Sequence, residues 1–243
     1  MNKKNLYIFS LLALLVSCSG NQQKAAKPAS DKPKTEAVRP RVRKTIPTIK
    51  EFSYITSLSG MNIVYTQGDY NIEAEGDSAL INYLRTDFDS QILTLSIQGE
   101  ANADLNLLEG KVDITLYISS PHLDCVSLCG SGNFTQKGTL RSNNFQMGLM
   151  GKGNIVCDTI IAPALRFECS QPGSASFGRI VTNDMLIYNR ASSTFKADID
   201  CGLLNVINTT SGTVTLSGYA KEKHVTNSSN GKVTCTWDQF VSK

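Results

Sequence analysis

Two aspartates near residue 200 have the types and spacing that come nearest to a catalytic arrangement. Asp198 and Asp200 would share one face of a strand, and Asp184 or Glu168 would lie on neighbouring segments of a repeating fold. Paired carboxylates can act as acid and base in glycoside hydrolysis or bind a calcium ion. No basic or aromatic cluster accompanies them, and the single Trp237 lies near the C-terminus. We therefore expect solubilising surface groups, with no catalytic, cofactor-binding or metal-binding residues; a carbohydrate-active enzyme is the alternative.

The cysteines are the second group that could do chemistry. Besides Cys18 the chain contains Cys125, Cys129, Cys157, Cys169, Cys201 and Cys235. An even number in an exported chain fits disulfides, but four residues along a strand span about 12 Å, which exceeds the reach of a Cys125–Cys129 bridge. Buried free thiols are the interpretation that we favour, and disulfides stay open. A metal site is not expected, because C-x-x-C is absent and His122 and His224 are the only histidines.

A short turn signal recurs through the second half of the chain and provides the frame for these residues. It reads S-G-N at 131–133, K-G-N at 152–154 and S-G-T at 211–213, with weaker copies between. The turn residues follow one another at intervals of 21, 20, 20, 19 and 19 and are Gly132, Gly153, Gly173, Ser193, Gly212 and Gly231. A fixed period near 20 residues predicts a stacked repeat.

Apolar residues flank every turn residue at fixed offsets. Two residues after the turn residues stand Phe134, Ile155, Ala175, Phe195, Val214 and Val233; six before them stand Val126, Met147, Phe167, Ile187, Val206 and Val225. Such columns predict two short strands per repeat that face a common interior, which only stacked neighbours can close. The sequence therefore predicts an all-β fold: a right-handed parallel β-helix or β-solenoid with coils of about 20 residues.

Three asparagines stand four residues before the last three turn residues. Stacked coils would let Asn189, Asn208 and Asn227 hydrogen-bond to one another as an amide ladder. Turns favour Asn in any case, so turn chemistry alone explains the same residues. The ladder and the turn interpretation both stay open.

The N-terminal residues have the pattern of an export signal. Residues 1–17 carry Lys3 and Lys4 before an apolar run at 6–16, which is shorter than the roughly 20 residues of a membrane-spanning helix. The sequence L-V-S-C at 15–18 resembles the lipobox of bacterial lipoproteins. That resemblance implies cleavage before Cys18, diacylation of its thiol and acylation of the new amino terminus. Several acyl chains would attach the protein stably to a membrane.

Residues 18–50 are rich in Ser, Gln, Ala, Pro and Lys and predict a disordered tether. Their net charge is +7, whereas the body at 51–243 has a net charge of −6. Because the body is acidic, nucleic-acid binding lacks its main electrostatic support. The basic tether could lie on anionic headgroups, although a solvated linker is the simpler interpretation.

The first part of the body contains strand patterns without the regular turn. Alternating apolar residues at 59–65, 70–74, 93–97 and 112–118 predict strands. Between them Asp77 or Ser78 could cap one short helix over residues 79–84. Residues 99–110 are expected to form a polar loop, and Pro121 ends this half.

Three segments together resemble a known family. They are F-S-Y-I-T-S-L-S-G-M-N-I-V-Y-T-Q-G-D at 52–69, V-D-I-T-L-Y-I-S-S-P-H-L at 112–123, and G-S-G-N at 130–133 with the turns that follow. The chain is similar over residues 52–238 to the DUF2807 family, the autotransporter adhesin, head GIN domain proteins common in Bacteroidetes. It departs from the family pattern at Met61, because the Gly-Ile-Asn motif of the family has Ile at this position. It also departs in the weak turns at 171–174 and 190–194. The resemblance implies an adhesin-like role and brings no catalytic residues.

The expected function is therefore binding or scaffolding by a lipid-anchored envelope protein, with a protein or glycan as ligand and an undefined oligomeric state. A purely structural envelope component is a further alternative. Ser19 after the lipidated cysteine resembles an outer-membrane signal, and the acidic cluster that resembles a surface-export signal is missing. The periplasmic face of the outer membrane and the cell surface are equally compatible with this pattern.

Overall fold

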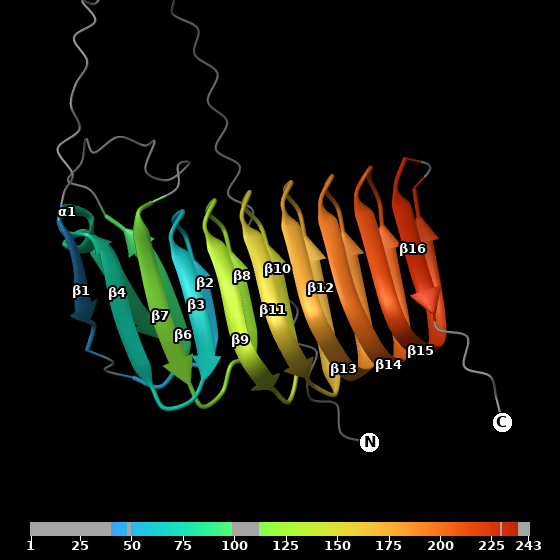
Figure 1. The fold of residues 1–243 in the computed structure, drawn as a ribbon, viewed down its shortest axis with the longest axis horizontal. Helices are drawn as coiled ribbons and strands as arrows, with labels where there is room; N and C mark the ends of the chain where they lie inside the picture. Colours follow the sequence, from blue (N-terminus) through green and yellow to red (C-terminus); the bar gives the residue numbers. More distant parts are fainter. Residues whose placement is uncertain (1–39, 48–49, 99–111, 229, 238–243) are drawn as a thin grey trace, which may run out of the picture. The chain divides into compact units, whose positions relative to one another are not determined.

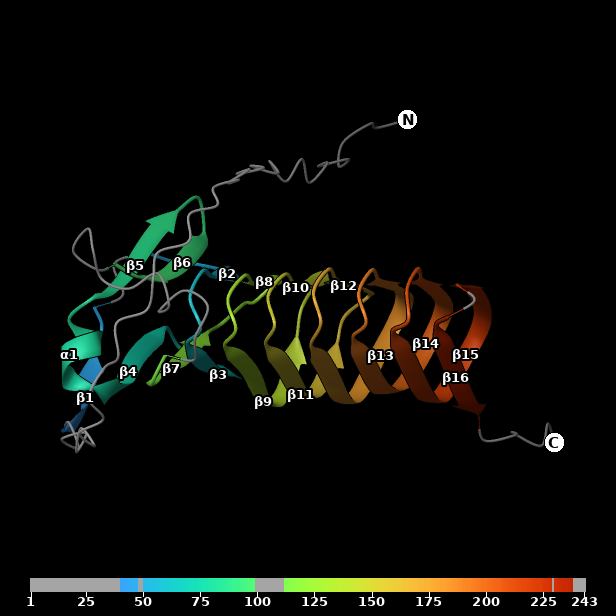
Figure 2. The same ribbon diagram turned by 90° about the horizontal axis from the view of Figure 1, so that it is seen from above.

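Stacked parallel strands form two facing layers of one solenoid (Figures 1 and 2). The computed structural model describes residues 40–47, 50–98, 112–228 and 230–237, all within the compact unit Arg39–Lys243. The expected signal peptide at 1–17, Cys18 and the tether up to residue 39 lie outside the described residues. No helix in the described ranges is long and apolar enough to cross a membrane.

The layer that follows the glycine turns is a parallel sheet. It consists of β7 (Ile114–Ser120), β3 (Asn62–Gln67), β9 (Asn133–Arg141), β11 (Asn154–Ile161), the first parts of β13 (Ser174–Asn189), β14 (Thr194–Asn208) and β15 (Thr213–Asn227), and β16 (Lys232–Trp237). The facing layer consists of β6 (Ile92–Ile97), β2 (Tyr54–Ser57), β8 (Cys125–Leu128), β10 (Phe145–Leu149), β12 (Ala164–Cys169) and the second parts of β13, β14 and β15. All-β architecture and a solenoid are confirmed; right-handed winding stays a prediction.

The apolar residues that the sequence analysis placed in two columns are paired with one another in the structure. The pairing runs Phe134, Ile155, Ala175, Phe195, Val214, Val233 in one layer and Val126, Met147, Phe167, Ile187, Val206, Val225 in the other. Ten of these twelve side chains are buried. Val225 is 45% exposed, because β16 pairs with β15 only over Thr213–Gly218 and no described strand pairs with the rest of β15 on the side away from β14.

Large side chains fill the space between the layers at the centre of the solenoid. The ring of Phe195 lies 4.9 Å from Phe167 and 5.2 Å from Phe177, measured between centroids. All three rings are buried, each from a different strand. Such aromatic packing adds to the free energy gained by burying their area.

Antiparallel strands close the N-terminal end of the solenoid. The sequence predicted the strand at 70–74 but neither the second strand nor the antiparallel pairing. β4 (Asn71–Asp77) pairs antiparallel with β7, and β5 (Leu84–Asp89) pairs antiparallel with β6. The helix predicted over 79–84 is wrong: a single turn, α1 (Ser78–Ile81), is followed by β5 from Leu84. Tertiary pairing with β6 overrides the local helical pattern there.

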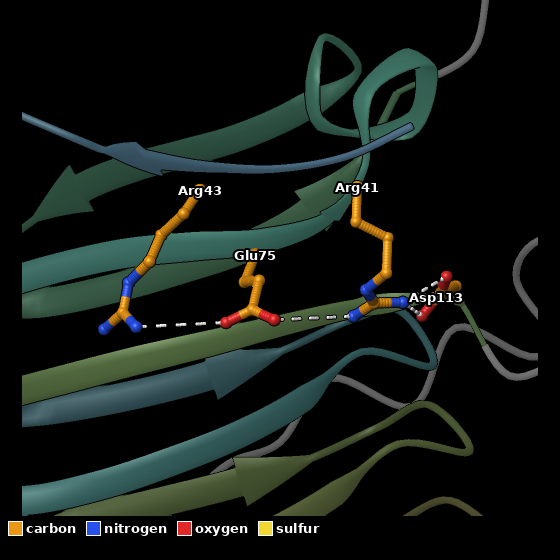
Figure 3. Close-up of polar contacts among 4 residues, drawn as sticks. All are labelled: Arg41, Arg43, Glu75 and Asp113. Atoms are coloured by element: carbon orange, nitrogen blue, oxygen red, sulfur yellow. Dashed lines mark hydrogen bonds and ion pairs between the residues drawn. The ribbon is translucent and has the colours of Figure 1, made fainter. Parts of the chain in front are cut away.

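A short strand from the expected tether pairs with this end. β1 (Arg41–Thr45) lies antiparallel to β4, so the expectation of a disordered segment up to residue 50 is wrong for these residues. Arg41 and Arg43 both point toward Glu75, and Arg41 also binds Asp113 (Figure 3). The nearest nitrogen of each guanidinium lies 3.9 Å from a carboxylate oxygen of Glu75. Arg43 also donates from Nε to Glu73 at 2.8 Å. Two of the basic residues that resembled a solvated linker, Arg41 and Arg43, therefore form ion pairs at the edge of the sheet.

Candidate functional site

The outward side of the first layer carries two columns of mainly polar residues. The residue after each turn residue points away from the core and is Asn133, Asn154, Ser174, Thr194, Thr213 and Lys232 in successive coils. Two residues further on stand Thr135, Val156, Ser176, Lys196, Thr215 and Thr234. We call these two columns, with Asn62 and Val64 of β3, the outer face. None of its described residues is buried.

The first column of the outer face begins with a continuous row of hydrogen bonds. Asn133 donates from Nδ2 to Oδ1 of Asn62 at 2.9 Å, and Asn154 donates to Oδ1 of Asn133 at 2.9 Å. Ser174 donates from Oγ to Oδ1 of Asn154 at 2.6 Å. We call these four residues the outer row. Since an amide has two N–H donors and the row uses one, each Asn keeps hydrogen-bonding capacity for a ligand or water.

Three asparagines form a second row, which is directed inward. Asn189 donates to Oδ1 of Asn208 at 3.0 Å, and Asn208 donates to Oδ1 of Asn227 at 2.8 Å. We call these residues the inner row. Asn208 and Asn227 also donate to the carbonyls of Gly212 and Gly231, four residues on, at 2.9 and 2.8 Å. The inner row therefore joins adjacent coils and also closes the turns.

The inner row explains the residue types at the later turns. A Cβ at Gly212 would lie 2.1 Å from Nδ2 of Asn189, and one at Gly231 would lie 2.3 Å from Nδ2 of Asn208. Ser193 occupies the equivalent position one coil earlier, and its hydroxyl donates to Oδ1 of Asn189. At Gly132 and Gly153 the close neighbours are main-chain atoms of the preceding turn, and at Gly173 a Cβ would also meet Leu149. Close stacking therefore demands a small residue at each turn.

The carboxylates considered for catalysis are bound to arginine. Arg179 donates to Asp198 at 2.9 Å and to Asp200 at 3.3 Å. Glu168 lies 3.0 Å from Arg166 and 3.6 Å from Arg190. These carboxylates are therefore engaged in ion pairs with arginine. Among the described residues, no group of three or more His, Cys, Asp or Glu could hold a metal ion.

All six described cysteines are free thiols. Cys125, Cys157, Cys169 and Cys201 are buried, Cys235 is half-buried and Cys129 is exposed. Burial raises the pKa of the Cys125 and Cys201 thiols to about 11, so they stay protonated and unreactive at neutral pH. The preferred interpretation of free thiols is confirmed, although Cys129 is not buried.

Sequence reasoning found the inner row as a candidate and missed the outer row as a connected feature. Its signal was present, because Asn133 and Asn154 directly follow their turn residues. The partner Asn62 lies 71 residues before Asn133 in sequence, outside the regular period. Cys18 lies outside the described residues, and the side chain of Trp237 is not described.

Comparison with known proteins agrees with this architecture. The model of the DUF2807 family, "Putative auto-transporter adhesin, head GIN domain", matches residues 51–182. The structure of a putative adhesin from Bacteroides fragilis NCTC 9343 is similar with a TM-score of 0.58 and 16% identity, over 81% of this chain and 97% of that chain. A putative adhesin from Parabacteroides distasonis ATCC 8503 gives a TM-score of 0.49 and 14% identity, over 82% and 98%. No curated protein matches by sequence. The family match covers more than half of the chain, which therefore belongs to the DUF2807 family.

Proposed function

We propose that this protein is a non-enzymatic, adhesin-like binding protein of the bacterial cell envelope, and that the outer face is its binding surface. The observation that carries the proposal is the outer row, where hydrogen bonds fix solvent-accessible amides and a hydroxyl at the spacing of adjacent coils. Strand spacing is about 4.8 Å, so the face presents a regular array of polar groups. An ordered array loses little entropy on binding an extended polar ligand such as a glycan.

The family supports this class of function through its description as an adhesin. The ion pairs of Asp198 and Asp200 with Arg179 also favour binding over catalysis, because they engage the best candidate carboxylate pair in a surface ion-pair network. A structural role alone would not require polar groups aligned on an exposed face.

Membrane attachment through a lipid on Cys18 is part of the same proposal, after removal of residues 1–17 as a signal peptide. It rests on the lipobox-like sequence at 15–18 and on Ser19, which favours the outer membrane. A lipid anchor would hold the solenoid near an envelope surface, where many weak polar contacts add up.

Protease treatment of intact cells tests the location that an adhesin requires. We expect the solenoid to be degraded while a periplasmic control protein stays intact. Protection of the solenoid would contradict a surface adhesin and would restrict its ligands to the periplasm. Metabolic labelling with a lipid precursor, lost in Cys18→Ala, tests the anchor separately.

A further inference from the structure

A small cleft lies where the first coils turn from one layer to the other. It has a volume of about 270 Å³ and is lined by Gln67, His122, Asp124, Arg141, Ser142 and Asn143. These residues come from the end of β3, the connection between β7 and β8, and the end of β9 with its following turn. The volume is slightly below the roughly 300 Å³ at which pockets for drug-sized ligands begin, so one small polar molecule would fill it.

The walls of the cleft are fixed by one glutamine. Gln67 donates from Nε2 to the carbonyls of Pro121 at 2.7 Å and Arg141 at 2.9 Å, and its Oε1 accepts from the Arg141 main-chain N–H at 2.9 Å. Both ends of this amide are therefore used to join segments 54 and 74 residues apart in sequence. A second link holds the turn, because Ser142 donates from Oγ to Asp124 Oδ1 at 2.9 Å. The cleft is preorganised before any ligand arrives.

The polar groups that remain in the cleft are of mixed kinds. The Arg141 guanidinium forms no ion pair with a described residue. In this it differs from five arginines that each pair with a carboxylate, namely Arg41, Arg43, Arg166, Arg179 and Arg190. Arg141, His122 and Asn143 are exposed, so a ligand can reach them. Asp124 uses one carboxylate oxygen for Ser142, and its other oxygen can accept a further hydrogen bond.

We propose that this cleft binds a sugar acid, a pyranose that carries one carboxylate, at the exposed end of a glycan. The planar guanidinium of Arg141 matches a carboxylate through two parallel hydrogen bonds. Asp124 accepts from sugar hydroxyls, while Asn143 and His122 can donate or accept. Phosphate fits less well, because the carboxylate of Asp124 would repel a dianion. A neutral sugar would make no ion pair with Arg141 and finds no Phe, Tyr or Trp among the lining residues to stack on.

This inference rests on the proposed binding function. It adds a second binding site, apart from the outer face, and names the class of ligand that this site binds. The test is an NMR titration of the isotope-labelled full chain with methyl glucuronide, compared with methyl glucoside, acetate, inorganic phosphate and glycine. We expect saturable shifts at residues 122–124 and 141–143, with a dissociation constant of about 1 mM. Arg141→Gln should weaken binding at least tenfold. Because Gln67 binds only the main chain of Arg141, this variant keeps the walls of the cleft.

Lys152→Gln is the matched control, because it removes one exposed positive charge from a turn outside the cleft and should leave binding unchanged. Absence of shifts in the cleft with methyl glucuronide would overturn the proposal. Equal binding of acetate, phosphate or glycine would overturn the ligand class by showing a simple anion or amino-acid site, and tighter binding of methyl glucoside would do the same. Failure here leaves binding at the outer face intact, since that binding depends on other residues and is measured with its own variants.

Discussion

The inner row and the outer row use the same side chain at the same coil spacing but lie in opposite environments. Asn189 and Asn208 are fully buried, whereas Asn62 and Asn133 are half-buried and Asn154 is exposed. Neighbouring amides in both rows are joined by bonds of 2.8–3.0 Å. A buried polar group without its partner costs about 1–3 kcal/mol, while an exposed one turns to water. We infer that the inner row stabilises the fold and that the outer row is available for binding.

Replacing Asn208 gives the largest expected effect. Asn208→Leu keeps the branched shape of the side chain but removes three hydrogen bonds, namely those to Asn189, to the carbonyl of Gly212 and to Asn227. We expect the free energy of unfolding to fall by about 3 kcal/mol, since each of the three lost hydrogen bonds contributes about 1 kcal/mol. The melting temperature should drop by roughly 6–12 °C. Thermal unfolding followed by circular dichroism measures this, and a drop of less than about 2 °C would refute a stabilising inner row.

Adding a methyl group beside the inner row should have the next largest effect. In Gly212→Ala the new Cβ would lie 2.1 Å from Nδ2 of Asn189 and 2.6 Å from the Ala191 carbonyl. We expect a loss of about 1–3 kcal/mol from overpacking. Gly68→Ala is the control, because no atom lies within 4 Å of its new Cβ. Urea unfolding of both variants decides the point, and equal midpoints would contradict the close contact at Gly212.

Removing an amide from the outer row should change stability little. Asn154→Ala breaks the bonds to Asn133 and Ser174, but water can replace both. We expect a change within about 0.5 kcal/mol, as for most surface substitutions. The same urea series measures it. A loss comparable to that of Asn208→Leu would remove the distinction between the two rows.

Salt should act on the N-terminal edge and leave both rows unaffected. The ion pairs of β1 are exposed, and about 1 M salt reduces the screening length to about 3 Å. We therefore expect backbone amides of Arg41–Thr45 to exchange faster with solvent deuterium at high salt, while amides of β13 and β14 keep their protection. Unchanged exchange in β1 would show that main-chain pairing with β4 holds it without the ion pairs.

The repeat period predicted the register because each coil pairs with the next along the chain. The same period held an unused signal for the partner of Asp198 and Asp200, since Arg179 stands 19 and 21 residues before them. The period does not predict the strand pairing in the N-terminal half. There β3 lies between β7 and β9, and β2 lies between β6 and β8, all of which come much later in the sequence. Composition gave a wrong prediction at Arg41–Thr45, because alternating basic residues are typical of a solvated linker. Only the folded chain shows that carboxylates of β4 lie beside these residues. The cleft combines residues as far apart as Gln67 and Asn143 and therefore requires the folded chain.

The most direct test of the division between the two rows is a binding measurement on the full chain against immobilised envelope and host polysaccharides. The test variant replaces Asn62, Asn133 and Asn154 with alanine, and Asn208→Leu is the comparison at a temperature where it remains folded. The account predicts that the triple variant loses polysaccharide binding with a nearly unchanged melting temperature, and that Asn208→Leu binds normally but melts earlier. Full binding by the triple variant would contradict the outer row as the binding surface.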